Sequence, residues 1–154
     1  MTEEIIKIKS EWKIPYTHTA GEFASRFFKE IRDNKKLYAV KCSGCRRVLF
    51  PPRPFCEKCF QKIDEWIEVK DEGELIAFTI SYMKYTGLPD PPYSICVVKL
   101  DGTDTPFVHR LGGVDLSDWK EATKKIKIGA KVKAVWKEKN EREGRITDIL
   151  FFKP

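Results

Sequence analysis

The stretch CSGCRRVLFPPRPFCEKC, residues 42–59, contains two Cys-x-x-Cys pairs that are separated by ten residues and a proline-rich turn. Each pair has the spacing of a metal-binding knuckle, and two knuckles supply four thiolates to a tetrahedral ion. Zinc in a shell of four thiolates has no open coordination position, so it cannot bind and activate water. The sequence therefore predicts a structural zinc site without catalysis at the metal. Its expected ligands are Cys42, Cys45, Cys56 and Cys59.

Disulfide bonds are the competing interpretation of the same cysteines, because they form in oxidising compartments. Residues 1–10 alternate charged and apolar side chains and lack the continuous apolar stretch of a signal peptide, and no later run approaches membrane-spanning length. We therefore expect a cytoplasmic protein whose paired cysteines bind metal, with iron as the competing ion. We also expect Gly44 to supply a positive φ in the first knuckle.

Composition fits a globular chain with one compact domain and a small module. The chain has 154 residues, 42% of them hydrophobic, with a formal net charge of +6 and a pI near 9.0. A basic surface suits phosphate-bearing partners, either nucleic acid or a charged cofactor. Part of the excess lies beside the cysteines, where it can neutralise a four-thiolate zinc centre of about −2 charge. These basic residues are Lys41, Arg46, Arg47, Lys58 and Lys62.

The N-terminal third predicts a helix followed by the metal module. Residues 19–22, with the sequence TAGE, have the form of a capping box, so a helix is expected from there to about Asn34. Phe23, Phe27 and Ile31 form an apolar stripe, which can pack either on the chain's own barrel or on a partner; intramolecular burial is the commoner fate. Residues 37–62 should form the metal module, with a short strand at 47–50.

From residue 65 onward the pattern has the period of β-strands. Strands are expected at 66–69, 74–83, 93–100, 105–111, 130–137 and 145–152, with a short helix starting near Ser117. Five main strands with a helix before the last pair match an OB-type barrel, while the first short strand can belong to either module. In the strand at 74–83, alternation places Ile76, Phe78, Ile80 and Tyr82 inside the barrel. The predicted domains are 1–36, 37–64 and 65–154.

Several phrases beyond the cysteines carry a resemblance to a known family. They are Phe50-Pro51-Pro52-Arg53 between the cysteine pairs, Trp66 with Gly73-Glu74-Leu75, Pro92-Tyr93, and Ile128-Gly129-Ala130-Lys131-Val132. With these phrases the chain resembles the acyl-CoA-associated proteins that have an N-terminal helix, a rubredoxin-like zinc ribbon and a C-terminal OB fold, formerly a domain of unknown function. The resemblance implies a mainly β fold and a non-catalytic scaffold that bridges thiolase and hydroxymethylglutaryl-CoA synthase and helps hold the CoA thioester.

Residues that could bind CoA occur in two places. Arg46, Arg47 and Arg53 flank the ribbon, and His109 and Arg110 precede a glycine pair at the end of a strand. For Arg46 and Arg47 the simpler interpretation is charge balance at the zinc site or a solvated surface, and for His109 it is a partly exposed strand histidine. These five residues are the candidate CoA-binding set.

Three functions remain open from the sequence. The first is the non-catalytic accessory subunit of thiolase-class enzymes in lipid or isoprenoid metabolism, with acyl-CoA as a ligand and no membrane partner. The second is a nucleic-acid-binding module, although the face of Ala77, Thr79 and Ser81 lacks the aromatic and basic residues that bases and phosphates need. The third is an enzyme acting through Cys96 or His109; Cys96 lies among apolar residues and reads as a buried small hydrophobe.

Overall fold

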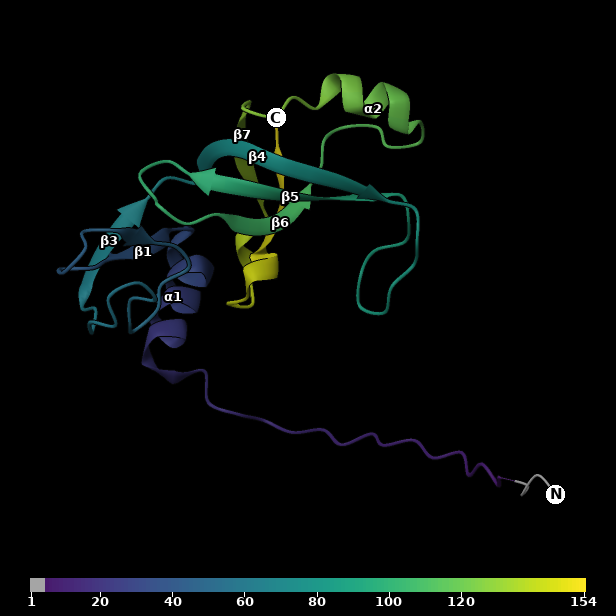
Figure 1. Cartoon of the computed structure of the whole chain (residues 1–154), viewed down its shortest axis with the longest axis horizontal. Coiled ribbons are helices and arrows are strands. Elements are labelled where there is room, and N and C mark those ends of the chain that lie inside the picture. The colour runs from purple at the N-terminus through teal and green to yellow at the C-terminus, as the bar shows by residue number, and fades with distance from the viewer. Residues whose placement is uncertain (1–4) are drawn as a thin grey trace.

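The computed structural model describes residues 5–154 as an extended N-terminal segment, a helix, a small zinc-ribbon sheet and a closed barrel (Figure 1). No helix within residues 5–154 is long and apolar enough to cross a membrane. The helical elements are α1 (Gly21–Asn34), α2 (Trp119–Lys125) and two single turns of 3-10 helix, η1 (Lys139–Glu141) and η2 (Ile146–Asp148). The strands are β1 (Leu37–Lys41), β2 (Val48–Leu49), β3 (Glu65–Val69), β4 (Glu72–Ser81), β5 (Tyr93–Leu100), β6 (Phe107–Leu111), β7 (Lys131–Trp136) and β8 (Ile149–Lys153).

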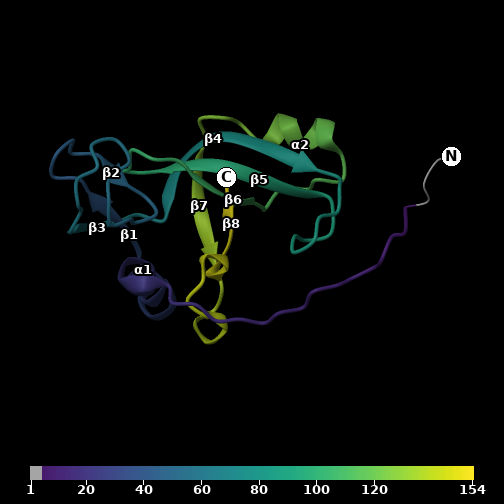
Figure 2. The ribbon, with the colours of Figure 1, turned by 60° about the horizontal axis from the view of Figure 1, so that its bottom comes forward.

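Helix α1 packs against its own chain, as its apolar stripe predicts. Phe27 and Ile31 are buried in the same core as the barrel residues, and Figure 2 shows α1 beside the ribbon sheet and the base of the barrel. The predicted capping box is wrong: Ala20 is the N-cap and makes no side-chain bond. The Thr19 hydroxyl accepts a hydrogen bond from the Gly21 N–H instead, at 3.1 Å.

The ribbon sheet has the strand order β2-β1-β3, and both pairings are antiparallel. Strand β3 pairs along its whole length with β1, from Glu65 opposite Lys41 to Val69 opposite Leu37. The short strand that the sequence left unassigned therefore belongs to the ribbon sheet, while the predicted domain bounds stay a prediction. Trp66 of β3 stacks on Phe23 of α1, with the ring centroids 5.1 Å apart. This contact fixes the helix on the ribbon.

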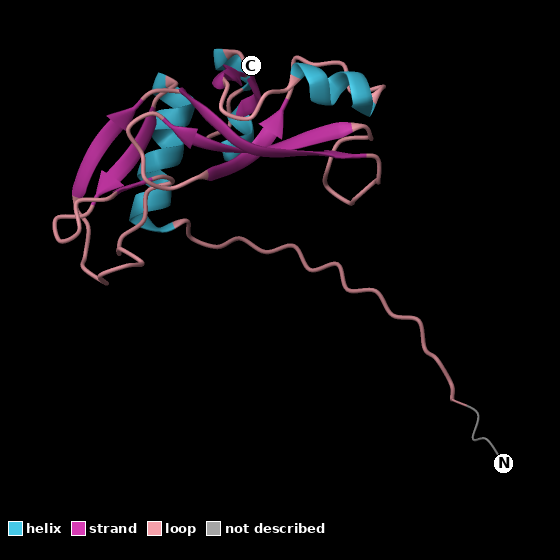
Figure 3. Ribbon diagram, turned by 45° about the horizontal axis from the view of Figure 1, so that its top comes forward, coloured by secondary structure: helices cyan, strands magenta, loops and turns pink. Residues whose placement is uncertain are grey.

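The five remaining strands close into a barrel in the order β4-β5-β6-β8-β7, and α2 connects β6 to β7 (Figure 3). This is the predicted OB-type barrel. Its interior is filled by one side of each strand, as the period of two requires. Val98 and Leu100 of β5, Phe107 of β6 and Phe152 of β8 are among the buried residues.

Two details of the barrel differ from prediction. A bulge between Leu75 and Ala77 shifts the register of β4, so Leu75 is buried whereas Ile76 and also Tyr82, beyond the end of the strand, are exposed. The predicted inward positions of Ile76 and Tyr82 are therefore wrong: the bulge changes the alternation at Ile76, and Tyr82 follows the last residue of the strand, Ser81. The last strand begins at Ile149 rather than at residue 145, since η2 precedes it.

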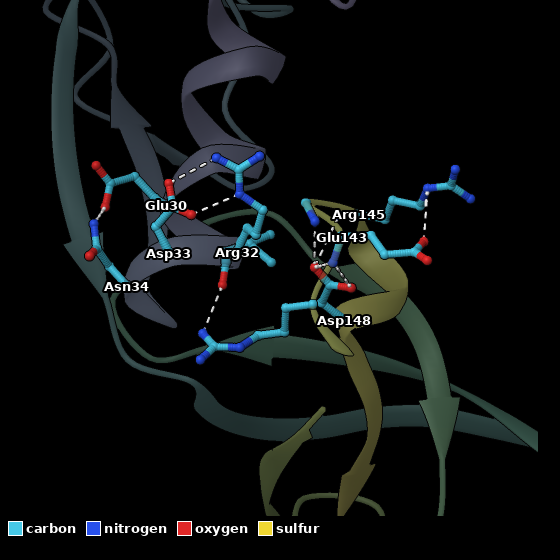
Figure 4. Close-up of polar contacts among 10 residues, drawn as sticks. Glu30, Arg32, Asp33, Asn34, Glu143, Arg145 and Asp148 are labelled. Carbon is cyan, nitrogen blue, oxygen red and sulfur yellow. Dashed lines mark hydrogen bonds and ion pairs between the residues drawn. The ribbon is translucent and has the colours of Figure 1, made fainter. Parts of the chain in front are cut away.

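The turn before β8 is organised around a buried carboxylate. Asp148 accepts hydrogen bonds from the N–H groups of Glu143, Gly144 and Arg145, at 3.1, 2.7 and 3.2 Å (Figure 4). Burial alone would raise the pKa of Asp148, yet these donors and the nearby Lys137 ammonium hold it below its ordinary value. The same turn reaches α1 through Arg142, which donates to the Ile31 carbonyl at 3.3 Å.

The ribbon and the barrel are joined at Phe50. Its ring meets Phe27 of α1 at 5.7 Å and Phe107 of β6 at 5.1 Å, both edge to face. Its backbone is held by Thr105, whose hydroxyl donates to the Phe50 carbonyl and accepts from the Phe50 N–H, each at 2.7 Å. The two modules therefore share one core in the described chain.

Candidate metal centre and ligand groove

The four cysteine sulfurs lie within 4.8 Å of one another. Cys42 Sγ and Cys59 Sγ are 3.3 Å apart, and Cys45 Sγ and Cys56 Sγ are 3.5 Å apart. Four ligands at the usual zinc–sulfur length of about 2.3 Å would be separated by about 3.8 Å in a tetrahedron. The donor set and its spacing therefore fit a closed four-thiolate zinc site.

The two knuckles repeat the same backbone geometry. The Cys42 N–H donates to the Arg47 carbonyl at 2.9 Å, and the Cys56 N–H donates to the Gln61 carbonyl at 3.0 Å. The residues that follow the second cysteines, Arg46 and Phe60, have φ values of 60° and 58°. The positive φ expected at Gly44 is thus wrong, and an added Cβ there would meet the movable end of an exposed side chain and, at 3.3 Å, Cys59 Sγ. A Cβ at Gly44 would lie 2.5 Å from Gln61 Oε1.

Backbone amides prepare the first cysteine of each knuckle to ligate a cation. The N–H of Cys45 lowers the pKa of Cys42, and the N–H groups of Cys59 and Lys58 lower the pKa of Cys56 to about 6. The pKa of Cys59 rises to about 11, because the neighbouring thiols and burial outweigh the Gln61 N–H that lowers it. Four close sulfurs cannot all ionise alone, whereas a divalent cation would hold all of them as thiolates.

Two of the three ribbon arginines, Arg47 and Arg53, form ion pairs with one carboxylate, that of Glu57. Glu57 Oε1 is 2.6 Å from Arg47 Nη1, and Glu57 Oε2 is 3.4 Å from Arg53 Nη1. Arg46 is exposed and forms no ion pair with any of residues 5–154. Arg47 is thus paired with a carboxylate, and charge balance at the zinc site stays a prediction for it. A role in binding CoA stays a prediction for all three arginines.

A groove of about 400 Å³ lies on the barrel between the β4–β5 loop and strands β5 and β6. We call it the outer groove. Leu88 and Pro89 of the loop, Ile95 of β5 and Val108 of β6 give it an apolar lining, and Arg110 adds one guanidinium. Leu88 and Ile95 also line a neighbouring hollow of about 540 Å³ with Tyr82, Met83 and Tyr85, so the apolar surface continues across the loop.

His109 lies at the wall of the outer groove as a neutral imidazole. Burial lowers the pKa of His109, and the Arg110 charge lowers it further. Its Nε2 is 3.3 Å from the Ile146 carbonyl, so the proton belongs on Nε2 and Nδ1 is left as an acceptor. Nδ1 is buried and has no hydrogen-bond partner among the described residues. Because this nitrogen is shielded from solvent, it is not available to a ligand in the outer groove.

Cys96 is unsuited to act as a nucleophile. It is completely buried in the barrel, and burial raises the pKa of its thiol to about 11. His109 lies opposite Cys96 in the β5–β6 pairing. Its Nε2 is near the Ile146 carbonyl, and its Nδ1 has no hydrogen-bond partner among the described residues, so neither nitrogen bonds to the thiol. The residue packs as a small hydrophobe, as the sequence predicts.

The structure brings only part of the predicted CoA-binding set together. His109 and Arg110 line one groove, and none of the ribbon arginines lines it. Sequence reasoning missed Leu88 and Val108 as members of this surface. The signal for it was the apolar character of both faces of β5, which left the outer side of Ile95 and Val97 in need of a cover.

Two family models match the chain. The model for the rubredoxin-like zinc ribbon domain of ChsH2 matches residues 30–63, and that for the C-terminal OB-fold domain of ChsH2 matches residues 66–137. A DUF35 domain-containing scaffold protein of Methanocaldococcus jannaschii is 28% identical over 133 residues, covering 84% of this chain and 89% of the relative. Another, of Pyrococcus furiosus, is 30% identical over 78 residues, 50% of this chain and 57% of the relative.

Solved structures agree on the fold. A DUF35-family protein of unknown function from Sulfolobus solfataricus superposes with a TM-score of 0.57 and 28% identity, covering 75% of this chain and 78% of the other. An Ltp2-ChsH2(DUF35) aldolase superposes with a TM-score of 0.60 over 89% of this chain and 98% of the other, and its 23% identity supports the fold alone. With the zinc-ribbon cysteines, the closed barrel and both domain models in the same order, the chain belongs to the ChsH2-type DUF35 family of zinc-ribbon and OB-fold proteins.

Proposed function

We propose that this protein is a non-catalytic accessory subunit that binds acyl-CoA-handling enzymes of the thiolase class and holds part of the CoA thioester. The outer groove is the observation that carries this proposal. It combines an exposed apolar lining with one guanidinium. The pantetheine arm of CoA is slender and partly apolar, and the nucleotide end of CoA carries phosphates, so the lining and the guanidinium each meet a complement.

The absence of a plausible reacting group among residues 5–154 supports an accessory role. The cysteine shell fits a closed metal site, and the Cys96 thiol is buried with a raised pKa. The relatives from M. jannaschii and P. furiosus are called scaffold proteins. The aldolase structure pairs a ChsH2 DUF35 protein with Ltp2, which makes a partner enzyme a reasonable expectation for this chain as well.

Co-expression with the thiolase and the hydroxymethylglutaryl-CoA synthase of the same organism tests the proposal. We expect a complex that co-purifies through size exclusion, and an acetyl-CoA titration that gives saturable heat in a calorimeter. Arg110→Gln and Val108→Ser should each weaken acetyl-CoA binding, by about tenfold or less, because each removes one groove contact. Ile128→Ser is the matched control, since Ile128 is an exposed apolar residue outside the outer groove.

A chain that remains alone with both enzymes and gives no heat with acetyl-CoA would overturn the proposal. Binding of a mixed-sequence oligonucleotide that weakens steeply as salt rises would favour the nucleic-acid module instead, because release of counterions from phosphates gives such a slope.

A further inference from the structure

The N-terminal segment 5–16 exposes a dense set of large apolar side chains. It runs as an extended chain away from the barrel and the ribbon, beyond the start of α1 (Figure 1). Exposed fractions range from 64% for Ile14 to 88% for Ile8. The apolar residues are Ile5, Ile6, Ile8, Trp12, Ile14 and Tyr16. Such a concentration on the surface is unfavourable in water and marks a site of interaction.

The side chains of this segment alternate with the period of a β-strand. Residues 6, 8, 12, 14 and 16 are apolar, and residues 7, 9, 11 and 13 are charged. In an extended chain, alternate side chains point to opposite faces, so one face is apolar and the other carries three lysines and one glutamate. A helix would scatter both sets around its axis. The segment therefore has the pattern of a half-buried strand, and among residues 5–154 no strand pairs with it.

Only one edge of the segment has a complete set of backbone donors. In a strand, the N–H and C=O groups of even and odd residues point to opposite edges. Pro15 has no N–H, so the odd-numbered edge is interrupted, whereas the even-numbered edge from Ile6 to Tyr16 retains every donor. The segment thus has the properties of an outermost strand.

The described chain offers this segment no adequate sheet edge. The barrel is closed and has no free edge, and β1 is paired on both sides. In the ribbon sheet the outer strands β2 and β3 have two and five residues, whereas the alternation spans eleven, from Ile6 to Tyr16. A strand added to β3 would leave about half of the apolar face uncovered.

We infer that residues 5–16 form a docking arm that adds as an outermost strand to an exposed sheet edge of the partner enzyme. The even-numbered side chains cover apolar surface of that enzyme, and the lysines face acidic side chains beside the edge. Main-chain hydrogen bonds supply affinity in this binding mode, and alternate side chains supply specificity. This inference rests on the proposed function and names the element through which the enzyme is bound.

A pair of proline substitutions distinguishes strand addition from nonspecific apolar binding by the arm. Ser10→Pro removes a donor from the pairing edge, and Glu11→Pro removes one from the edge that Pro15 already interrupts; neither removes an apolar side chain. The full-length proteins are titrated against the purified thiolase, the probe in this experiment, by biolayer interferometry. Ser10→Pro should weaken binding about tenfold and Glu11→Pro less than about twofold. Trp12→Ser should weaken it about thirtyfold, since a buried indole is a common interface anchor.

The arm makes no contact that the folded body requires, so all variants should keep the melting temperature and zinc content of the parent chain. If the parent chain binds the thiolase and the three variants bind equally well, the inference is overturned while the proposed function stands. Equal losses for Ser10→Pro and Glu11→Pro would also overturn strand addition. Failure of the parent chain to bind overturns the proposed function and this inference with it. Arm-dependent dimers, or protected arm amides in the isolated chain, would assign the arm to a second copy or to its own ribbon and overturn the inference.

Discussion

The knuckle segment, residues 42–63, and the barrel are held together by different physical means. The buried cluster of the knuckle segment has few members, and two of them, Cys42 and Cys56, are expected metal ligands. The barrel core contains a continuous set of aliphatic and aromatic side chains from all five strands. A segment that cannot bury enough apolar surface to offset its loss of conformational entropy needs a metal to do so. This contrast explains why the four cysteines are expected to stabilise the fold through a metal rather than to catalyse a reaction.

The largest expected effect comes from removing the metal. The double substitution Cys42→Ser and Cys56→Ser should abolish zinc binding and unfold the knuckle segment, while β4 to β8 stay folded with lower stability, because Phe50 belongs to this segment and leaves the shared core. Structural zinc in small modules contributes about 10–16 kcal/mol, far more than the few apolar contacts of this segment can replace. Zinc analysis and amide hydrogen exchange, resolved by residue, measure both parts.

Cys96→Ser is the control for that experiment, because Cys96 belongs to the barrel core and not to the metal site. It should retain a full complement of zinc and cost about 1–3 kcal/mol of stability through the buried hydroxyl. Slow amide exchange in residues 42–63 of the double variant would contradict the contrast between the two regions.

The next effect tests how far the two regions are independent. Phe50→Ala removes the ring that packs on both Phe27 and Phe107, and it should destabilise the whole fold by about 3–5 kcal/mol. Chemical denaturation gives the free energy of unfolding. The control Phe55→Ala removes an exposed ring from the same loop and should change it by less than about 0.5 kcal/mol. Loss confined to the knuckle segment would show that Phe50 does not couple the regions.

The same contrast explains what could be predicted from sequence. The cysteine spacing and the strand periodicity are local patterns, and they predicted the metal site, the barrel and the burial of α1 correctly. The bulge at Ile76 and the turn around Asp148 depend on how residues far apart in sequence meet, so alternation alone placed Ile76 wrongly. Tyr82 was placed wrongly because β4 ends one residue before it. The outer groove was missed for a related reason, because Leu88 and Val108 come together only when the β4–β5 loop folds over β6.

A buried carboxylate gives the barrel side a dependence on pH. Asp148→Asn should cost about 3 kcal/mol at pH 7, since an amide cannot accept from three N–H groups as a carboxylate does. The folded pKa of Asp148 is lowered, so its stabilisation is present above the unfolded pKa of about 3.9 and is lost as pH falls through the folded pKa.

Denaturation of parent and variant between pH 7 and pH 3 measures this dependence. The difference in unfolding free energy should shrink as the pH falls below about 4. Asp90→Asn is the control, because Asp90 is exposed and pairs only with Lys84 among the described residues. A difference that stays constant over the whole range would mean that the charge of Asp148 is not what stabilises the turn.

The smallest expected effect comes from the two hydrogen bonds between the Thr105 hydroxyl and the Phe50 backbone. Thr105→Val preserves the shape of the side chain but leaves the Phe50 N–H and C=O without their buried partner, which should cost about 2 kcal/mol. Thr105→Ser keeps the hydroxyl and should recover most of that loss, as measured by the denaturation midpoint. Because both groups belong to the residue that joins the modules, the loss should appear in the ribbon and the barrel together. A valine variant as stable as the serine variant would mean that water satisfies the Phe50 backbone, and that the joint depends on ring packing alone.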